Sequence, residues 1–200
     1  LVVFSLYNSI YFDIPKSEII AKHTNGSSQF ITLADGSEIH VRDEGNQSGK
    51  ILVMVHGFNG SLFNYEPLVP YLSKEYRLIS LDLPAHGLTG AVNSDLYNQE
   101  AYEKVIEEVV EILEIDKFYL VGHSMGGMIA WRYALSNLDQ LKGLIIIGSA
   151  FFANEQEFND FQSINAPPLA FELIESKFFI RLLEFLTPRI LVKEGVSQTV

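Results

Sequence analysis

The sequence predicts an α/β fold: a mostly parallel, doubly wound sheet, incomplete at the C-terminus and followed by the start of a helical cap. Three observations support this prediction. Continuous apolar runs, typical of buried strands, alternate with helical patterns from residue 51 onward. A hairpin with alternating apolar and polar residues precedes them. The stretch after residue 150 is rich in Phe and Leu and shows no strand pattern.

The individual elements follow from periodicity and from turn residues. A hairpin is predicted from residues 28–33 and 38–42, because Asp35-Gly36 between them is a strong turn signal. Apolar runs predict buried strands at residues 51–57, 77–83, 118–122 and 141–150. Helical spacing predicts helices at residues 67–74, 98–113 and 128–138, and two short helices in the cap at residues 169–176 and 178–186. In the first of these helices, Leu68, Tyr71 and Leu72 are expected to point inward.

We expect three segments: an N-terminal apolar segment (1–26), a core (27–150) and the start of a cap (151–200). Residues 1–12 carry no charge but fall short of the roughly 20 residues that span a bilayer. Two interpretations stay open. The stretch is the end of a membrane anchor or signal whose front is missing, or it is an apolar helix packed on the domain. The first residue, Leu1, favours the anchor, and with it a membrane-anchored or periplasmic location. If the stretch is a packed helix instead, a cytoplasmic location stays possible.

Composition excludes several classes of function. The chain has 14 Lys and Arg against 25 Asp and Glu, a net charge of -11, which argues against a nucleic-acid partner. It has no cysteine, so disulfides, thiolate metal sites and a cysteine nucleophile are excluded. The histidines are isolated, and neither a P-loop nor a dinucleotide motif occurs, so we expect no metal and no cofactor.

The central motif is Gly122-His123-Ser124-Met125-Gly126-Gly127, between a predicted strand and a predicted helix. It fits the pattern G-x-S-x-G in the context that a nucleophile requires. A sharp turn there projects the serine hydroxyl above the sheet, and the following helix points its N-terminus at the site. Ser124 is therefore the predicted nucleophile.

A second Gly-containing turn, His56-Gly57-Phe58-Asn59-Gly60, follows the first buried strand. Acyl transfer needs backbone N–H groups that face the developing oxyanion, and we assign this role to the N–H groups of Phe58 and Met125. His56, Asn59 and His123 are expected to contact the substrate. For His56, a structural role in the loops is favoured over a catalytic one.

A third loop contains Asp82-Leu83-Pro84-Ala85-His86-Gly87. Asp82 is predicted to order the loop, and His86 to lie at the rim of the site. The HGF, DLPAHG and GHSMGG motifs, in this order and spacing, resemble the α/β-hydrolase superfamily over residues 27–150. The most similar branch comprises serine esterases, carbon–carbon hydrolases and non-haem peroxidases. Asp13-Ile14-Pro15 resembles bacterial members with an N-terminal membrane anchor.

The resemblance implies a mechanism in which Ser124 attacks a carbonyl carbon after a histidine takes its proton. Dehalogenases and epoxide hydrolases of the family use Asp as nucleophile, so Ser124 speaks against both activities. Eight phenylalanines in the cap segment favour a small to medium hydrophobic ester as the substrate. A carbon–carbon bond beside a ketone and a non-catalytic binding role remain alternatives.

The chain departs from the family pattern in one respect. The family order is Ser, acid, His, yet all five histidines precede Ser124. We favour the interpretation that the parent protein continues beyond Val200 and that both missing residues lie in that part. A degenerate binding protein and a triad that recruits His86 are the other interpretations. Glu155 and Asp160 stand where some relatives place the acid, but they supply no base.

Overall fold

The computed structural model describes residues 10–11, 14–92, 97–149 and 187–188. The chain forms two units, one made of Leu1–Pro15 with Phe152–Val200 and the other of Lys16–Phe151. In the first unit, β1 (Ile10–Tyr11) pairs antiparallel with β8 (Thr187–Pro188). The expectation of no strand after residue 150 is therefore wrong at this short pair. The predicted cap helices lie outside the described residues.

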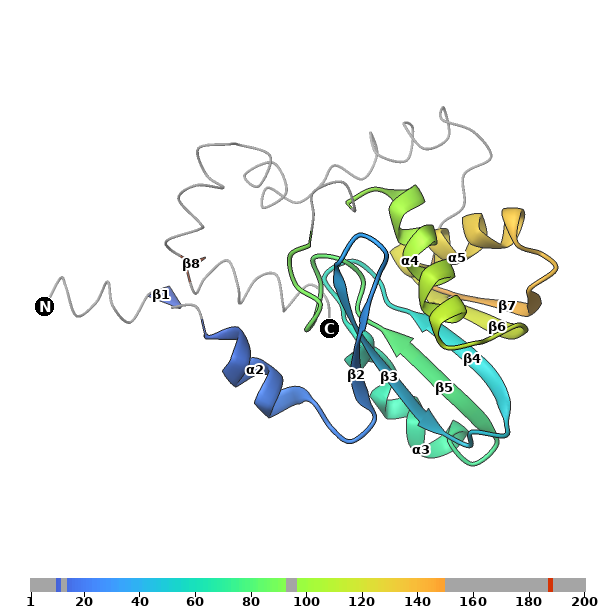
Figure 1. Cartoon of the computed structure of the whole chain (residues 1–200), viewed down its shortest axis with the longest axis horizontal. Coiled ribbons are helices and arrows are strands. Elements are labelled where there is room, and N and C mark those ends of the chain that lie inside the picture. Colours follow the sequence, from blue (N-terminus) through green and yellow to red (C-terminus); the bar gives the residue numbers. More distant parts are fainter. Residues whose placement is uncertain (1–9, 12–13, 93–96, 150–186, 189–200) are drawn as a thin grey trace, which may run out of the picture. The chain divides into compact units, whose positions relative to one another are not determined.

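The second unit contains a six-stranded sheet in the order β2-β3-β5-β4-β6-β7 (Figure 1). Its strands are β2 (Ser28–Thr32), β3 (Glu38–Gly45), β4 (Lys50–Val55), β5 (Tyr76–Leu81), β6 (Phe118–His123) and β7 (Leu141–Ile147). Strands β4, β5, β6 and β7 run parallel to one another, whereas β3 pairs antiparallel with both β2 and β5. The mostly parallel sheet and the hairpin that the sequence predicts are confirmed.

Helices cover both faces of this sheet, as the doubly wound prediction requires. On β4, Val53 and Val55 face a core completed by α4 (Gln99–Ile112) and α5 (Met125–Ser136). Leu52 and Met54, on the opposite face, pack against Tyr65, Val69 and Leu72. These three residues belong to the 3-10 helix η1 (Leu62–Leu68) and to α3 (Val69–Leu72). Figure 1 shows α3 and α4 on opposite sides of the sheet.

Two helix predictions need correction. The helix expected at residues 67–74 is a 3-10 helix from residue 62 followed by one turn of α-helix, so the inward face shifts. Tyr65 is buried, but Tyr71 is 82% exposed and Leu68 41% exposed. Of the three residues expected inward there, only Leu72 packs on the core. The helix expected from residue 128 already begins at Met125.

The N-terminal region is partly described. Residues 16–23, within the segment expected to be apolar, form helix α2 (Lys16–His23) and belong to the second unit. Among the residues that the structure describes, no helix is long and apolar enough to cross a membrane. The predicted anchor, residues 1–12, lies almost entirely outside them.

Candidate active site

Ser124 stands alone between the last residue of β6 and the first residue of α5. Its backbone has φ 51° and ψ -119°, in a region that residues with a side chain seldom adopt. Such a conformation costs about 1–3 kcal/mol and persists only where the surroundings enforce it. The sharp strand-to-helix turn that the motif predicts is therefore present.

Close backbone packing enforces this turn. A Cβ atom at Gly122 would overlap the carbonyl oxygen of Gly126, and a Cβ atom at Gly126 would overlap the carbonyl oxygen of Val55 at the end of β4. The two glycines of G-x-S-x-G thus let α5 begin directly against two parallel strands. Any larger residue at either position pushes the helix away from the sheet and moves Ser124.

The Ser124 hydroxyl does not cap the helix that follows it. Ser124 occupies the N-cap position of α5, where a serine side chain commonly accepts a backbone N–H, yet it makes no such bond. The residue is half-buried. Met125 is the first helical residue, so its N–H has no acceptor within the helix and lies at the positive end of the helix dipole.

The first Gly-containing turn lies beside the serine. A Cβ atom built on Gly57 would be 3.0 Å from Cβ of Ser124 and 3.1 Å from Nδ1 of His123. The N–H of Gly60 donates to the carbonyl oxygen of Gly57 at 3.1 Å, and Asn59 between them has φ 55°. The structure therefore brings the turn with the predicted donor Phe58 to the strand-to-helix turn of Ser124.

His56 holds this turn to the loop that follows β5. Its side chain is fully buried, Nδ1 donates to the carbonyl oxygen of Gly57 at 2.7 Å, and Nε2 accepts the N–H of Leu83 at 3.0 Å. Burial lowers the pKa of His56 from 6.5 to about 4, so the ring is neutral near pH 7. This geometry supports the structural role and leaves neither ring nitrogen for a substrate.

Two further histidines lie next to the same turn, and both are half-buried. The Nδ1 atom of His86 donates to the carbonyl oxygen of Pro84 at 2.9 Å, and its ring lies 5.0 Å from the ring of His56. The ring of His123 lies beside Gly57. In the described part of the chain, no histidine is hydrogen bonded to the hydroxyl of Ser124.

Asp82 orders the loops, as its position in the sequence predicts. Oδ1 accepts the N–H of Leu62 at 2.7 Å, and Oδ2 accepts the N–H of Leu88 at 2.8 Å and Nδ1–H of His40 at 2.7 Å. The fully buried carboxylate therefore joins the start of η1, the loop after β5 and strand β3. Both carboxylate oxygens therefore have a structural role.

Sequence reasoning did not single out Ser149, whose Oγ donates to the carbonyl oxygen of Ser124 at 2.7 Å. The signal that could have found it is a hydroxyl two residues after the end of β7, the strand that pairs with β6. The predicted cap and the candidate acids Glu155 and Asp160 lie outside the described residues. Within the described ranges, no cluster of three or more His, Cys, Asp or Glu could hold a metal ion.

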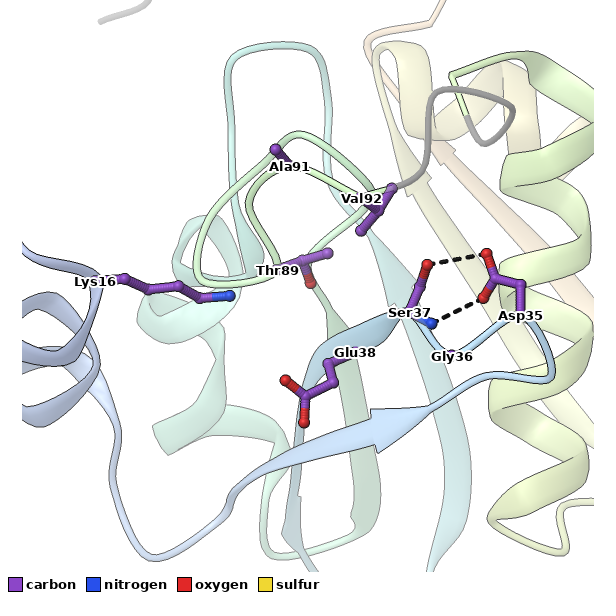
Figure 2. Close-up of a pocket in the computed structure, with 8 residues that line it drawn as sticks. All are labelled: Lys16, Asp35, Gly36, Ser37, Glu38, Thr89, Ala91 and Val92. Atoms are coloured by element: carbon purple, nitrogen blue, oxygen red, sulfur yellow. Dashed lines mark hydrogen bonds between the residues drawn. The ribbon is translucent and has the colours of Figure 1, made fainter.

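A polar pocket of about 310 Å³ lies elsewhere in the same unit (Figure 2). Lys16, Glu38 and Thr89 line it together with the hairpin turn, in which Ser37 bonds Asp35 through its N–H and its hydroxyl. None of the predicted site residues borders this pocket. The bond between the Ser37 hydroxyl and the Asp35 carboxylate closes an exposed hairpin turn, so Ser124 remains the best candidate centre.

Comparisons with known proteins match the part of the chain that contains these motifs. The model of the alpha/beta hydrolase fold family matches residues 50–172. A 2-hydroxy-6-oxononadienedioate/2-hydroxy-6-oxononatrienedioate hydrolase of Cupriavidus pinatubonensis is 32% identical over 136 residues, 62% of this chain and 45% of that protein. Epoxide hydrolase 4 of Homo sapiens is 27% identical over 124 residues, 61% of this chain and 34% of that protein.

Among solved structures, the esterase RhEst1 from Rhodococcus sp. ECU1013 is similar with a TM-score of 0.57 and 27% identity. The match covers 62% of this chain and 46% of the esterase. The chain spans less than half the length of the curated relatives that it matches, 42% to 46% for the first three.

Proposed function

Because the chain belongs to the alpha/beta hydrolase fold family, we propose that it carries the nucleophile and the oxyanion donors of a serine hydrolase. The substrate class that we propose is a small to medium hydrophobic ester. The observation that carries the proposal is Ser124 itself: a half-buried serine at φ 51°, with a hydroxyl that does not cap its helix, at the N-terminus of α5.

The proposed reaction has two steps. A histidine base takes the hydroxyl proton while Ser124 Oγ attacks the ester carbonyl carbon, and the oxyanion is held by the N–H groups of Met125 and Phe58. The intermediate collapses, the alcohol leaves with the proton, and an acyl-enzyme remains. Water, activated by the same base, then releases the acid and restores Ser124.

The source of the base distinguishes two versions of this proposal. In the usual family order, acid and base would follow Ser124 in the chain, and no histidine does so within these 200 residues. In the other version, the base is His86, since Nδ1 of this half-buried ring already donates to Pro84 and Nε2 is left as the acceptor. We favour the first version, because an acid-oriented base after the nucleophile is the arrangement that the fold family implies.

Carbon–carbon hydrolysis is the second candidate. The relative from Cupriavidus pinatubonensis, whose name describes hydrolysis of an oxo-dienedioate, favours it. Both reactions need an oxyanion site near Ser124, so the described residues suit either one. Epoxide opening, the activity in the name of the human relative, is not proposed, because its family mechanism uses Asp where this chain has Ser124.

The test consists of two separate assays. One is covalent labelling of the protein with a fluorophosphonate, and the other is hydrolysis of p-nitrophenyl butyrate by protein that has not been labelled. We expect labelling at Ser124, and loss of both labelling and hydrolysis in Ser124→Ala. Ser136→Ala, an exposed serine at the end of α5, is the matched control and keeps both. The base is identified from the hydrolysis rates of three proteins: residues 1–200, the product of the full coding sequence, and the His86→Ala variant. Absence of labelling in every form would support the non-catalytic interpretation.

A further inference from the structure

The end of β7 holds both backbone polar groups of Ser124. The N–H of Ser124 donates to the carbonyl oxygen of Ile147 at 2.9 Å, and its carbonyl oxygen accepts the hydroxyl of Ser149 at 2.7 Å. Gly148 between them has φ 56°, which lets the chain turn so that both groups face the same residue. Ile147 and Ser149 thus hold the strained residue from one side.

The carbonyl that Ser149 holds shares a peptide unit with a predicted oxyanion donor, the N–H of Met125. The carbonyl of Ser124 and the N–H of Met125 belong to one planar peptide unit and point in opposite directions. A hydrogen bond that fixes the carbonyl therefore also fixes the direction of the N–H. The same oxygen accepts the N–H of Gly127 at 2.9 Å and that of Met128 at 3.3 Å. Several donors on one carbonyl polarise the peptide and strengthen donation from its N–H.

The glycine at position 127 gives independent support. A Cβ atom there would lie 2.6 Å from Cβ and 2.7 Å from Oγ of Ser149. The pattern G-x-S-x-G requires only Gly122 and Gly126, so it does not account for a third glycine. The space that Gly127 leaves is occupied by Ser149, which allows its hydroxyl to reach the carbonyl of Ser124.

From these contacts we propose that Ser149 is a positioning residue, which orients the Ser124–Met125 peptide as a donor to the oxyanion. The inference rests on the function proposed above and adds a residue to it. The bond of Ser149 goes to the carbonyl oxygen of Ser124 and not to its hydroxyl, so we expect its effect in the transition state, where charge develops on the carbonyl oxygen of the substrate. Loss of a whole oxyanion donor lowers kcat by about 10²–10³, and we expect misorientation of one donor to lower it about tenfold.

The experiment uses the full-length protein with p-nitrophenyl butyrate and compares Ser149→Ala with Ser149→Thr and Ser149→Cys. We expect Ser149→Ala to lower kcat about tenfold with KM within twofold, since only transition-state stabilisation is lost. Thr retains the hydroxyl and recovers most of kcat. Cys matches the volume, donates weakly and gives an intermediate value, which covers the case in which Thr does not fit beside Gly127.

Two further readouts separate orientation from stability. Phenylboronic acid forms a tetrahedral adduct with a serine nucleophile, and its affinity falls in parallel with kcat if the oxyanion donor is disturbed. The matched control is Thr24→Val, which removes a hydroxyl bond to the carbonyl oxygen of Ile20, 2.8 Å long, at the end of α2. We expect this control to change stability by a similar amount without a change in kcat or in boronate affinity.

The outcomes distinguish this inference from the proposed function. If the wild-type protein labels at Ser124 but Ser149→Ala keeps its kcat and boronate affinity, the positioning role is overturned and the serine mechanism stands. The role is also overturned if Thr24→Val, with a similar loss of melting temperature, lowers kcat as much as Ser149→Ala does. If the wild-type protein does not label at Ser124, both proposals fail together.

Discussion

Oδ2 of Asp82 lies 2.7 Å from Nδ1 of His40, and both side chains are fully buried. The pair joins the end of β5 to β3, and Asp82 also accepts the N–H groups of Leu62 and Leu88. Since a buried carboxylate with three donors leaves all of them unpaired when it is lost, Asp82 is expected to matter more for stability than any exposed ion pair.

We predict that Asp82→Asn lowers the free energy of unfolding by about 3 kcal/mol, because an amide replaces one acceptor oxygen with a donor that faces another N–H. Urea denaturation followed by circular dichroism measures the loss. The control is Lys104→Ala, which removes the exposed end of the pair between Lys104 and Glu108 and should cost no more than about 0.5 kcal/mol. A loss below 1 kcal/mol for Asp82→Asn would contradict the role of the buried carboxylate.

The lowered pKa of His56 predicts a dependence of stability on pH. Burial lowers the folded-state pKa to about 4, below the ordinary 6.5, with smaller lowering effects from His86 and His123. Above pH 6.5 the ring is neutral in both states, so its contribution to stability is complete. Between pH 6.5 and 4 only the unfolded chain takes up the proton, and stability falls by about 1.4 kcal/mol per pH unit.

His56→Gln isolates this contribution. The variant is less stable at pH 7, and the difference from the wild-type protein narrows as the pH falls from 6.5 to 4, because the variant has no ring to protonate. Urea denaturation at five pH values in this range provides the measurement. Parallel stability curves for the two proteins would show that His56 is not the titrating group.

The sequence predicted the elements that depend on local patterns. The apolar runs of β4 to β7 and the Asp35-Gly36 turn are visible without tertiary information, and so is the motif around Ser124. The exposure of Tyr71 was mispredicted because a 3-10 helix has three residues per turn and rotates the side chains that follow it.

Contacts between distant segments had no local signal. His40 and Asp82 are 42 positions apart and meet only because β3 pairs antiparallel with β5. Ser149 and Ser124 are 25 positions apart and meet because β6 and β7 are parallel neighbours. Such pairs follow from strand order and register, which one sequence does not specify by itself.

Arg42 also makes contacts between segments that are distant in the sequence, and its side chain is 3% exposed. Its guanidinium donates to the side chain of Glu66 and, at 2.9 Å, to the carbonyl oxygen of His23, and it lies 4.5 Å from the ring centre of Phe63. Lys cannot reproduce two diverging bonds and a flat stacking surface at once. We therefore predict that Arg42→Lys destabilises the second unit by about 2 kcal/mol.

Thermal unfolding and limited proteolysis test this prediction. Because Arg42 bonds the last residue of α2, cleavage within α2 should become faster in Arg42→Lys before the whole unit unfolds. Arg132→Lys is the matched control, since that guanidinium is 44% exposed and bonds Glu103 at the surface. Equal effects of the two substitutions would argue that burial of Arg42 contributes nothing.

The backbone strain at Ser124 leads to a last prediction: a substitution that relieves the strain raises stability but removes activity. Gly adopts positive φ freely, so Ser124→Gly relieves the strain at φ 51° but loosens the unfolded chain. We expect Ser124→Gly to be about 1 kcal/mol more stable than Ser124→Ala, and at least as stable as the wild-type protein, while both variants lose labelling. Lys104→Gly, an exposed position inside α4, supplies the contrast and should lose about 1 kcal/mol. If Ser124→Gly is destabilised as much as Lys104→Gly, the turn is not strained, and its geometry is not held in place for chemistry.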